Sequence, residues 1–141
     1  MMRLLRLTVL IMTGLLSWQA QAELVVVVHP KNPADSLSRR EVVDLYMGRT
    51  QYFADGSLVI RLDQRPDSEE REQFYRDLVN KSVAEVNAYW ARLLFTGRAS
   101  PPQVVGDSEA VLKAVRDNTN AIGYLDSADV DASVKVVARV P

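Results

Sequence analysis

Leu24-Val25-Val26-Val27-Val28 is a continuous run of apolar, mostly β-branched residues. Residues of this kind favour strands, and an uninterrupted apolar run is typical of a strand that is buried on both faces of its sheet. His29 and Pro30 end the run. A sheet that is buried on both faces needs helices on each side, so this run predicts an α/β domain.

The rest of the chain alternates between segments of helical and strand character. Two helices open in capping boxes, Ser38 to Glu41 and Ser82 to Glu85, which satisfy the free groups of a helix start. We expect further helices that begin near Ser68 and at Asp107 or Ser108, and strands at residues 58–62, 103–105, 121–125 and 134–140. The order β-α-β-α-α-β-α-β-β predicts one three-layer lobe with a mixed, mainly parallel sheet.

Each predicted helix carries an apolar face at helical spacing. Tyr89, Trp90 and Phe95 fit a core helix better than a platform on which nucleic-acid bases stack. We therefore expect the helices to cover the sheet with these faces. Their residues are Val42, Leu45 and Tyr46; Phe74, Leu78 and Val79; Val83, Val86, Trp90, Leu93 and Leu94; and Val111, Leu112 and Val115.

The first 22 residues have the features of a secretory signal peptide. Residues 1–6 carry two arginines and no acid, residues 7–16 are apolar, and Ala20-Gln21-Ala22 has the pattern that signal peptidase cleaves. Ten apolar residues span about 15 Å as a helix, half of a roughly 30 Å bilayer core, which argues against the alternative of an uncleaved anchor. We expect a signal peptide at residues 1–22 and one periplasmic domain at residues 23–141.

Composition excludes several functional classes. The chain of 141 residues has no cysteine and one histidine, so it offers no disulfide framework and no cysteine-ligated metal site. Its formal net charge of −1 lacks the basic surplus of a nucleic-acid-binding protein. No nucleophile motif or facing acid–base pair occurs, since Glu69 and Glu70 diverge on their helix. We expect no enzyme, no metal and no cofactor.

The segment from Asp63 to Arg71 is the best candidate for a binding site. We expect residues 63–67 to form a loop between a strand and the helix that begins near Ser68. In open α/β sheets ligands bind beyond the carboxyl ends of strands, and a helix start offers free N–H groups to an anion. Ser68 can add a hydroxyl donor, and Arg65 and Arg71 can form two-pronged bonds to an oxyanion.

The same residues also fit a purely structural role. In that alternative Ser68 or Asp67 caps the helix, and both arginines pair with neighbouring carboxylates. Residues 63–72 contain five acids and two arginines, a net charge of −3. A carboxylate about 5 Å from a bound anion costs on the order of 3 kcal/mol at an effective dielectric near 20. The two alternatives stay open on the residues alone.

The order of short motifs resembles the phosphate-binding protein of the phosphate ABC transporter, a type 2 periplasmic binding protein. The resemblance covers most of residues 23–141 but only one lobe of a family whose members have two. At the phosphate loop Arg65, Ser68 and Arg71 match, whereas Glu69 and Glu70 replace a Gly-Thr pair. The matching motifs are Leu45-Tyr46-Met47-Gly48, Phe53-Ala54-Asp55-Gly56, Arg65-Pro66-Asp67-Ser68 with Arg71 and Phe74, Ala88-Tyr89-Trp90, Phe95-Thr96-Gly97, Pro101-Pro102 and Ala121-Ile122-Gly123-Tyr124.

The resemblance implies a periplasmic solute-binding-like protein, without enzymatic activity, that takes part in the uptake or sensing of phosphate or another oxyanion. The binding residues it implies are Arg65, Ser68 and Arg71. A single open lobe leaves its ligand partly hydrated, so we expect weak affinity unless a second chain, such as a second copy in a homodimer, covers it. The alternative function is an interaction module that binds no ligand and docks on a membrane transporter, a sensor or another periplasmic protein.

Overall fold

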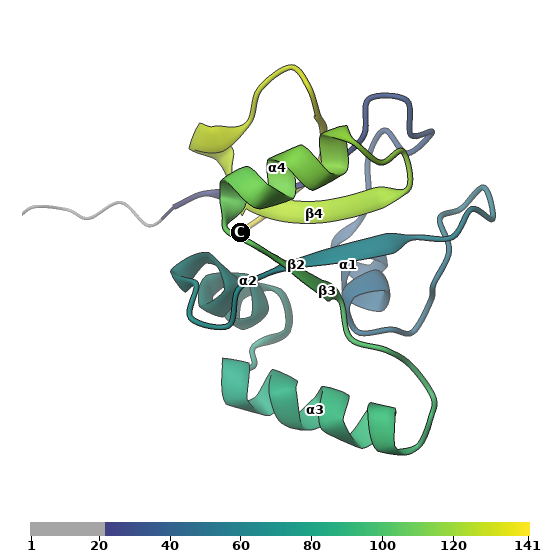
Figure 1. Ribbon diagram of the computed structural model, residues 1–141, viewed down its shortest axis with the longest axis vertical. Helices are drawn as coiled ribbons and strands as arrows, with labels where there is room; N and C mark the ends of the chain where they lie inside the picture. The colour runs from purple at the N-terminus through teal and green to yellow at the C-terminus, as the bar shows by residue number, and fades with distance from the viewer. Residues whose placement is uncertain (1–21) are drawn as a thin grey trace, which may run out of the picture.

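β1 (Leu24–Val28) lies inside a five-stranded sheet with the strand order β3-β2-β4-β1-β5 (Figure 1). β2 runs parallel to β3 and to β4, whereas β1 is antiparallel to both of its neighbours, β4 and β5. The prediction of a mixed sheet is confirmed, and two of its four strand pairings are parallel and two antiparallel. The remaining strands are β2 (Ile60–Gln64), β3 (Gln103–Gly106), β4 (Ala121–Asp126) and β5 (Lys135–Val140).

The computed structural model describes residues 22–141. The predicted signal peptide, residues 1–22, therefore lies outside the described residues except for Ala22. Within residues 22–141 no helix has the length and apolar character needed to cross a membrane.

Helices cover the two faces of the sheet unequally. Leu24, Val26 and Val28 of β1 belong to one apolar cluster with residues of three helices, and the alternate residues Val25 and Val27 belong to a second cluster with residues of a fourth. All five residues are buried, so the prediction of a strand buried on both faces is confirmed. The first face carries α1 (Arg39–Tyr46) and α2 (Glu69–Val79), with α3 (Val83–Phe95) packed on α2. The second face carries α4 (Ser108–Arg116), which contacts the short 3-10 helix η1 (Ser127–Asp129).

Local hydrogen bonds explain why the four helices begin where they do. A side-chain oxygen of the residue before each helix accepts a hydrogen bond from the backbone N–H three residues later, which satisfies a group with no intrahelical partner. The predicted capping boxes at Ser38 and Ser82 are both present. The four capping residues are Ser38, Ser68, Ser82 and Asp107.

A cluster of aromatic rings joins α1 and α2 to the sheet. The rings of Phe74 and Tyr124 are stacked with centroids 3.8 Å apart, and Tyr46 meets Phe74 edge-on at 4.9 Å. The Tyr46 hydroxyl donates a hydrogen bond to the carbonyl oxygen of Leu62 at 2.8 Å. The cluster therefore holds both helices at the end of β2 from which the candidate loop leaves.

The prediction for the second strand was wrong by two residues. We expected a strand at residues 58–62 and a loop from Asp63, but β2 spans Ile60–Gln64. Leu58 forms an isolated antiparallel bridge with Tyr52 instead. Asp63 and Gln64 continue the strand and are buried, because neighbouring side chains satisfy their polar groups. A polar pair at the end of an apolar run was thus misinterpreted as a loop.

The predicted apolar face of α3 was also partly wrong. Val86 and Trp90 are buried, but Leu94 is 53% exposed and Phe95 is 94% exposed. In Figure 1, α3 lies beyond α2 and away from the sheet, and Leu94 and Phe95 are its last two residues. The expectation that Phe95 belongs to the core is therefore corrected.

We predict that Gly123→Ala destabilises the protein because α4 packs closely on β4. A Cβ at Gly123 would overlap Cγ1 of Val111 and lie 3.4 Å from Cγ2 of Val115. Overpacking of this kind costs about 1–3 kcal/mol in the free energy of unfolding, measured by urea denaturation. Adding Val111→Ala makes room for the new methyl group, so the double variant should lose less than the sum of the single variants. Strict additivity would contradict the proposed overlap.

Candidate functional site

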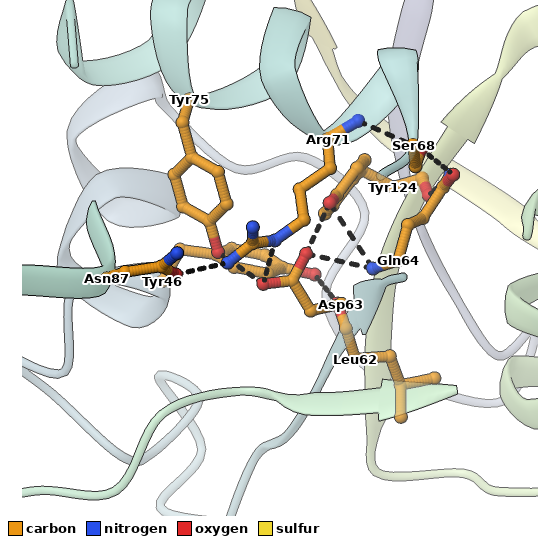
Figure 2. Close-up of polar contacts among 9 residues, drawn as sticks. All are labelled: Tyr46, Leu62, Asp63, Gln64, Ser68, Arg71, Tyr75, Asn87 and Tyr124. Carbon is orange, nitrogen blue, oxygen red and sulfur yellow. Dashed lines mark hydrogen bonds and ion pairs between the residues drawn. The ribbon is translucent and has the colours of Figure 1, made fainter. Parts of the chain in front are cut away.

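The carboxylate of Asp63 stands at the centre of a buried polar network at the end of β2 (Figure 2). Its Oδ2 accepts a hydrogen bond from the hydroxyl of Tyr75 at 2.7 Å. Its Oδ1 accepts one from the hydroxyl of Tyr124 and one from the backbone N–H of Gln64 at 2.8 Å. Asp63 is 2% exposed, so these donors replace the water that a carboxylate would otherwise bind.

Arg71 supplies the positive charge of this network. Its Nε lies 3.4 Å from Oδ2 of Asp63, and its Nη2 donates to Oδ1 of Asn87 on α3 at 3.2 Å. The guanidinium also lies over the ring of Tyr75, 5.4 Å from its centroid. Arg71 is 6% exposed, and its Nη1 has no hydrogen-bond partner among the described residues. The charge of Arg71 is thus directed into the core.

Gln64 links the starts of two helices. Its Nε2 donates to Oγ of Ser108, the first residue of α4, at 3.2 Å, and to the carbonyl oxygen of Tyr124 at 3.1 Å. Its Oε1 lies 2.8 Å from Oγ of Ser68, the N-cap of α2. The Ser68 hydroxyl also lies 3.0 Å from Oε2 of Glu70. Its single hydrogen can be donated to only one of these two acceptors at a time. Gln64 is fully buried and holds the two helix starts at a fixed separation.

A pocket of about 390 Å³ opens between these two helix starts. The first two N–H groups of each helix, at Glu69 and Glu70 and at Ser108 and Glu109, have no intrahelical acceptor. Aligned peptide dipoles add partial positive charge at both starts. The lining residues are Gln64, Arg65, Ser68, Glu70, Asp107, Ser108, Glu109, Leu112 and Asp129.

The charged side chains of the pocket oppose this favourable backbone potential. Four carboxylates line it, against the single guanidinium of Arg65. Arg65 also pairs with Asp67, with Nε 3.2 Å from Oδ1, although both side chains are largely exposed. The side-chain charge of the lining is therefore −3, which weakens the attraction for an anion. The four carboxylates are those of Glu70, Asp107, Glu109 and Asp129.

The three residues predicted from the sequence fall into two places. Arg65 and Ser68 line the pocket, whereas Arg71 contacts Asp63, Asn87 and the ring of Tyr75 behind it. The structural role that the sequence left open is also observed, since Ser68 caps α2 and both arginines form ion pairs. Binding of a ligand by Arg65, Ser68 and Arg71 stays a prediction.

Sequence reasoning missed several residues that shape the site. Asp63 and Gln64 were assigned to a loop, Tyr124 was taken only as part of a strand, and Tyr75 was not singled out. Ser108 was considered only as a cap, although it lines the pocket and accepts a hydrogen bond from Gln64. A useful signal was the spacing of Asp63, Arg71 and Tyr75, which places an acid at a strand end near donors on the next helix.

No family model matches the sequence, and no curated protein matches it either. Solved structures do share its fold. A protein from Clostridium perfringens, assigned as a phosphate ABC transporter substrate-binding protein and solved with bound phosphate, superposes with a TM-score of 0.67 at 21% identity, covering 82% of this chain and 44% of its own. An ABC-type phosphate transport receptor from Vibrio cholerae gives 0.66 at 21% identity, covering 82% and 45%.

PstS from Borrelia burgdorferi superposes with a TM-score of 0.64 at 12% identity, covering 83% of this chain and 47% of its own. The chain thus spans less than half the length of these similar structures. The likeness confirms the predicted α/β fold of a single lobe with a mixed sheet. At these identities it concerns the fold alone.

We predict that Asp63→Asn lowers the free energy of unfolding by about 3–5 kcal/mol, since it leaves the buried guanidinium of Arg71 without its counter-charge. Urea denaturation followed by circular dichroism measures the change. Asp67→Asn removes the partner of the exposed Arg65 and should cost no more than about 1 kcal/mol. Equal effects of the two variants would show that the buried pair is not critical for stability.

Alkaline pH should unfold the protein cooperatively. Burial, and then the nearby Asp63 carboxylate, raise the pKa of Tyr46, Tyr75 and Tyr124 above the ordinary tyrosine value. Above a pH of about 10 the unfolded chain therefore loses these protons while the folded chain keeps them. The free energy of unfolding then falls with rising pH, by about 1.4 kcal/mol per pH unit for each tyrosine.

Urea denaturation between pH 9 and 11 measures this slope. Tyr75→Phe removes one of the three titrating groups and should reduce the slope by about one third, by the same linkage. A stability that does not change across this pH range would contradict the prediction.

Proposed function

We propose that the protein is a non-enzymatic solute-binding protein that binds a small oxyanion, phosphate in the first instance, in the pocket between α2 and α4. The observation that carries the proposal is the meeting of two helix starts at one pocket, with the Ser68 hydroxyl and the Arg65 guanidinium beside them. Helix starts and arginine are the groups that most often bind phosphate in proteins. The similar structures support this choice because they are named as phosphate transport proteins.

Within this proposal the three predicted residues have different roles. Arg65 and Ser68 contact the oxyanion directly. Arg71 acts mainly through its ion pair with Asp63 and through its backbone N–H, which donates to Oγ of Ser68 at 3.2 Å. It therefore holds the loop that presents Ser68 rather than supplying charge to the ligand.

The affinity should be low for two reasons. Glu70 competes for the Ser68 hydroxyl, and the four lining carboxylates repel an anion. The pocket is also open to solvent on one side, so that a bound ion keeps part of its hydration. We expect residues 1–22 to direct export to the periplasm, where a membrane transporter or a sensor protein is the corresponding partner.

The same carboxylates favour a second candidate function, an interaction module that has lost its ligand. In this case Arg71 serves the core alone, and the acidic pocket faces a partner protein. The specific observation is that Arg71, a cationic group that matches the resembling motif, is neutralised by Asp63. Calorimetry separates the two functions.

Titration of phosphate at low salt into the purified protein should give weak saturating heat, with sulfate as the comparison anion. The double variant Glu69→Gly/Glu70→Thr restores the loop of the resembling family and removes two carboxylates. We expect it to bind phosphate at least about tenfold more tightly, because each nearby carboxylate opposes the anion by an energy on the order of 1–3 kcal/mol.

Glu72→Gln is the matched control, since Glu72 is exposed on the same helix but does not line the pocket. It should leave the affinity nearly unchanged, whereas Arg65→Ala should weaken binding roughly tenfold through the loss of a charge-assisted bond. If neither the natural protein nor the double variant gives saturating heat, the oxyanion proposal is wrong and the interaction module is favoured.

A further inference from the structure

The C-terminal end of α3 carries an exposed apolar knob with basic edges. Phe95 is 94% exposed and Leu94 is 53% exposed, and they are flanked by the exposed Arg92 and Arg98. Neither arginine forms an ion pair with any of residues 22–141. No acidic residue occurs between positions 86 and 106. We call Arg92, Leu94, Phe95 and Arg98 the α3 knob.

A groove of opposite charge lies beside α1. Two adjoining hollows of about 370 and 160 Å³ share Leu37, Glu41, Phe53 and Ala54, and together they form the α1 groove. Four carboxylates and no lysine or arginine are among its lining residues. The floor contains Pro33, Ala34, Leu37, Phe53 and Ala54, and the carboxylates are those of Asp35, Glu41, Asp44 and Asp55.

Two of these carboxylates are available to a cationic partner. Asp35 pairs with Lys135 and Asp44 with Arg49, whereas Glu41 and Asp55 form no ion pair within the part of the chain that the structure describes. Glu41 accepts a hydrogen bond from the backbone N–H of Ser38. Hydrogen bonds from Ser57 lower the pKa of Asp55, which therefore stays charged at neutral pH.

We propose that the α3 knob of one copy of this chain docks in the α1 groove of a second copy. The two surfaces are complementary in three respects. The protruding ring of Phe95 fits a hollow, and the apolar side chains of the knob face the apolar floor of the groove. Arg92 and Arg98 of the knob face the carboxylates at the edge of the groove. A hollow of about 370 Å³ is large enough for a phenyl ring. A contact of this kind removes Phe95 from water, which is the main driving force.

Knob and groove are different surfaces, so each copy carries one of each. Phe95 is 94% exposed in the single chain, so the knob does not occupy the groove of its own copy. One knob-in-groove contact leaves a free knob at one end and a free groove at the other, which generates rings or open chains, whereas two copies that exchange knobs reciprocally form a closed dimer. The inference is independent of the pocket between α2 and α4, because the two sites share no lining residue.

Sedimentation velocity on the purified protein over a wide concentration range tests the contact. The natural protein should associate at high concentration, and the association should weaken as salt rises, because dissolved ions screen the attraction between the arginines and the carboxylates. Phe95→Ser should weaken association at least about tenfold, in line with the loss of one buried aromatic side chain. Val104→Ser, which changes another exposed apolar residue outside knob and groove, is the control and should have little effect.

Mixing two variants gives the most specific test. Ala54→Arg fills the groove and neutralises its edge but leaves the knob intact, whereas Phe95→Ser leaves the groove intact. Each variant alone should be monomeric. An equimolar mixture should form a 1:1 dimer, because the Ala54→Arg variant supplies an intact knob and the Phe95→Ser variant supplies an intact groove. Circular dichroism shows that each variant is folded.

Three outcomes would overturn the inference. These are a natural protein that stays monomeric at every concentration, a Phe95→Ser variant that associates as well as the natural protein, and a mixture of the two variants that stays monomeric although the natural protein associates. The last result would indicate a symmetric contact or another occupant of the groove. None of these outcomes depends on phosphate, so failure here is distinguishable from failure of the proposed function.

Discussion

A buried carboxylate must be met by positive charge and by hydrogen-bond donors, and Asp63 imposes this constraint on the whole lobe. Its partners come from three elements: Gln64 from β2, Arg71 and Tyr75 from α2, and Tyr124 from β4. The network therefore fixes the direction of α2 relative to the sheet. Since an unpaired charge at this depth would cost several kcal/mol, the partners are held together as one unit.

This constraint determines which chemistry the candidate pocket can offer. The guanidinium of Arg71 pairs with Asp63, so it is not available to neutralise an anion in the pocket. What remains for a ligand is the pair of helix starts, the hydroxyls of Ser68 and Ser108, and the exposed Arg65. Four carboxylates surround these groups. The balance between backbone dipoles and side-chain charges thus decides whether the lobe binds an anion.

Positively and negatively charged side chains are concentrated in different parts of the surface. The segment from residue 86 to residue 106 carries arginines but no acids, while the α1 groove is lined by carboxylates without lysine or arginine. An almost fully exposed phenylalanine, Phe95, lies within the basic segment. Phe95 is the last residue of α3, which lies beyond α2 and away from the sheet (Figure 1).

The sequence by itself determined the order of strands and helices, the capping residues Ser38 and Ser82, and the two-sided burial of β1, because each depends on residues a few positions apart. Only the tertiary structure decided that β1 runs antiparallel to its neighbours, that Arg71 turns into the core and that Phe95 stays outside it. The hydrogen bond that ties Asp63 to Tyr124 joins residues 61 positions apart. A contact of that range leaves no local periodicity in the chain, so it arises only when the layers pack.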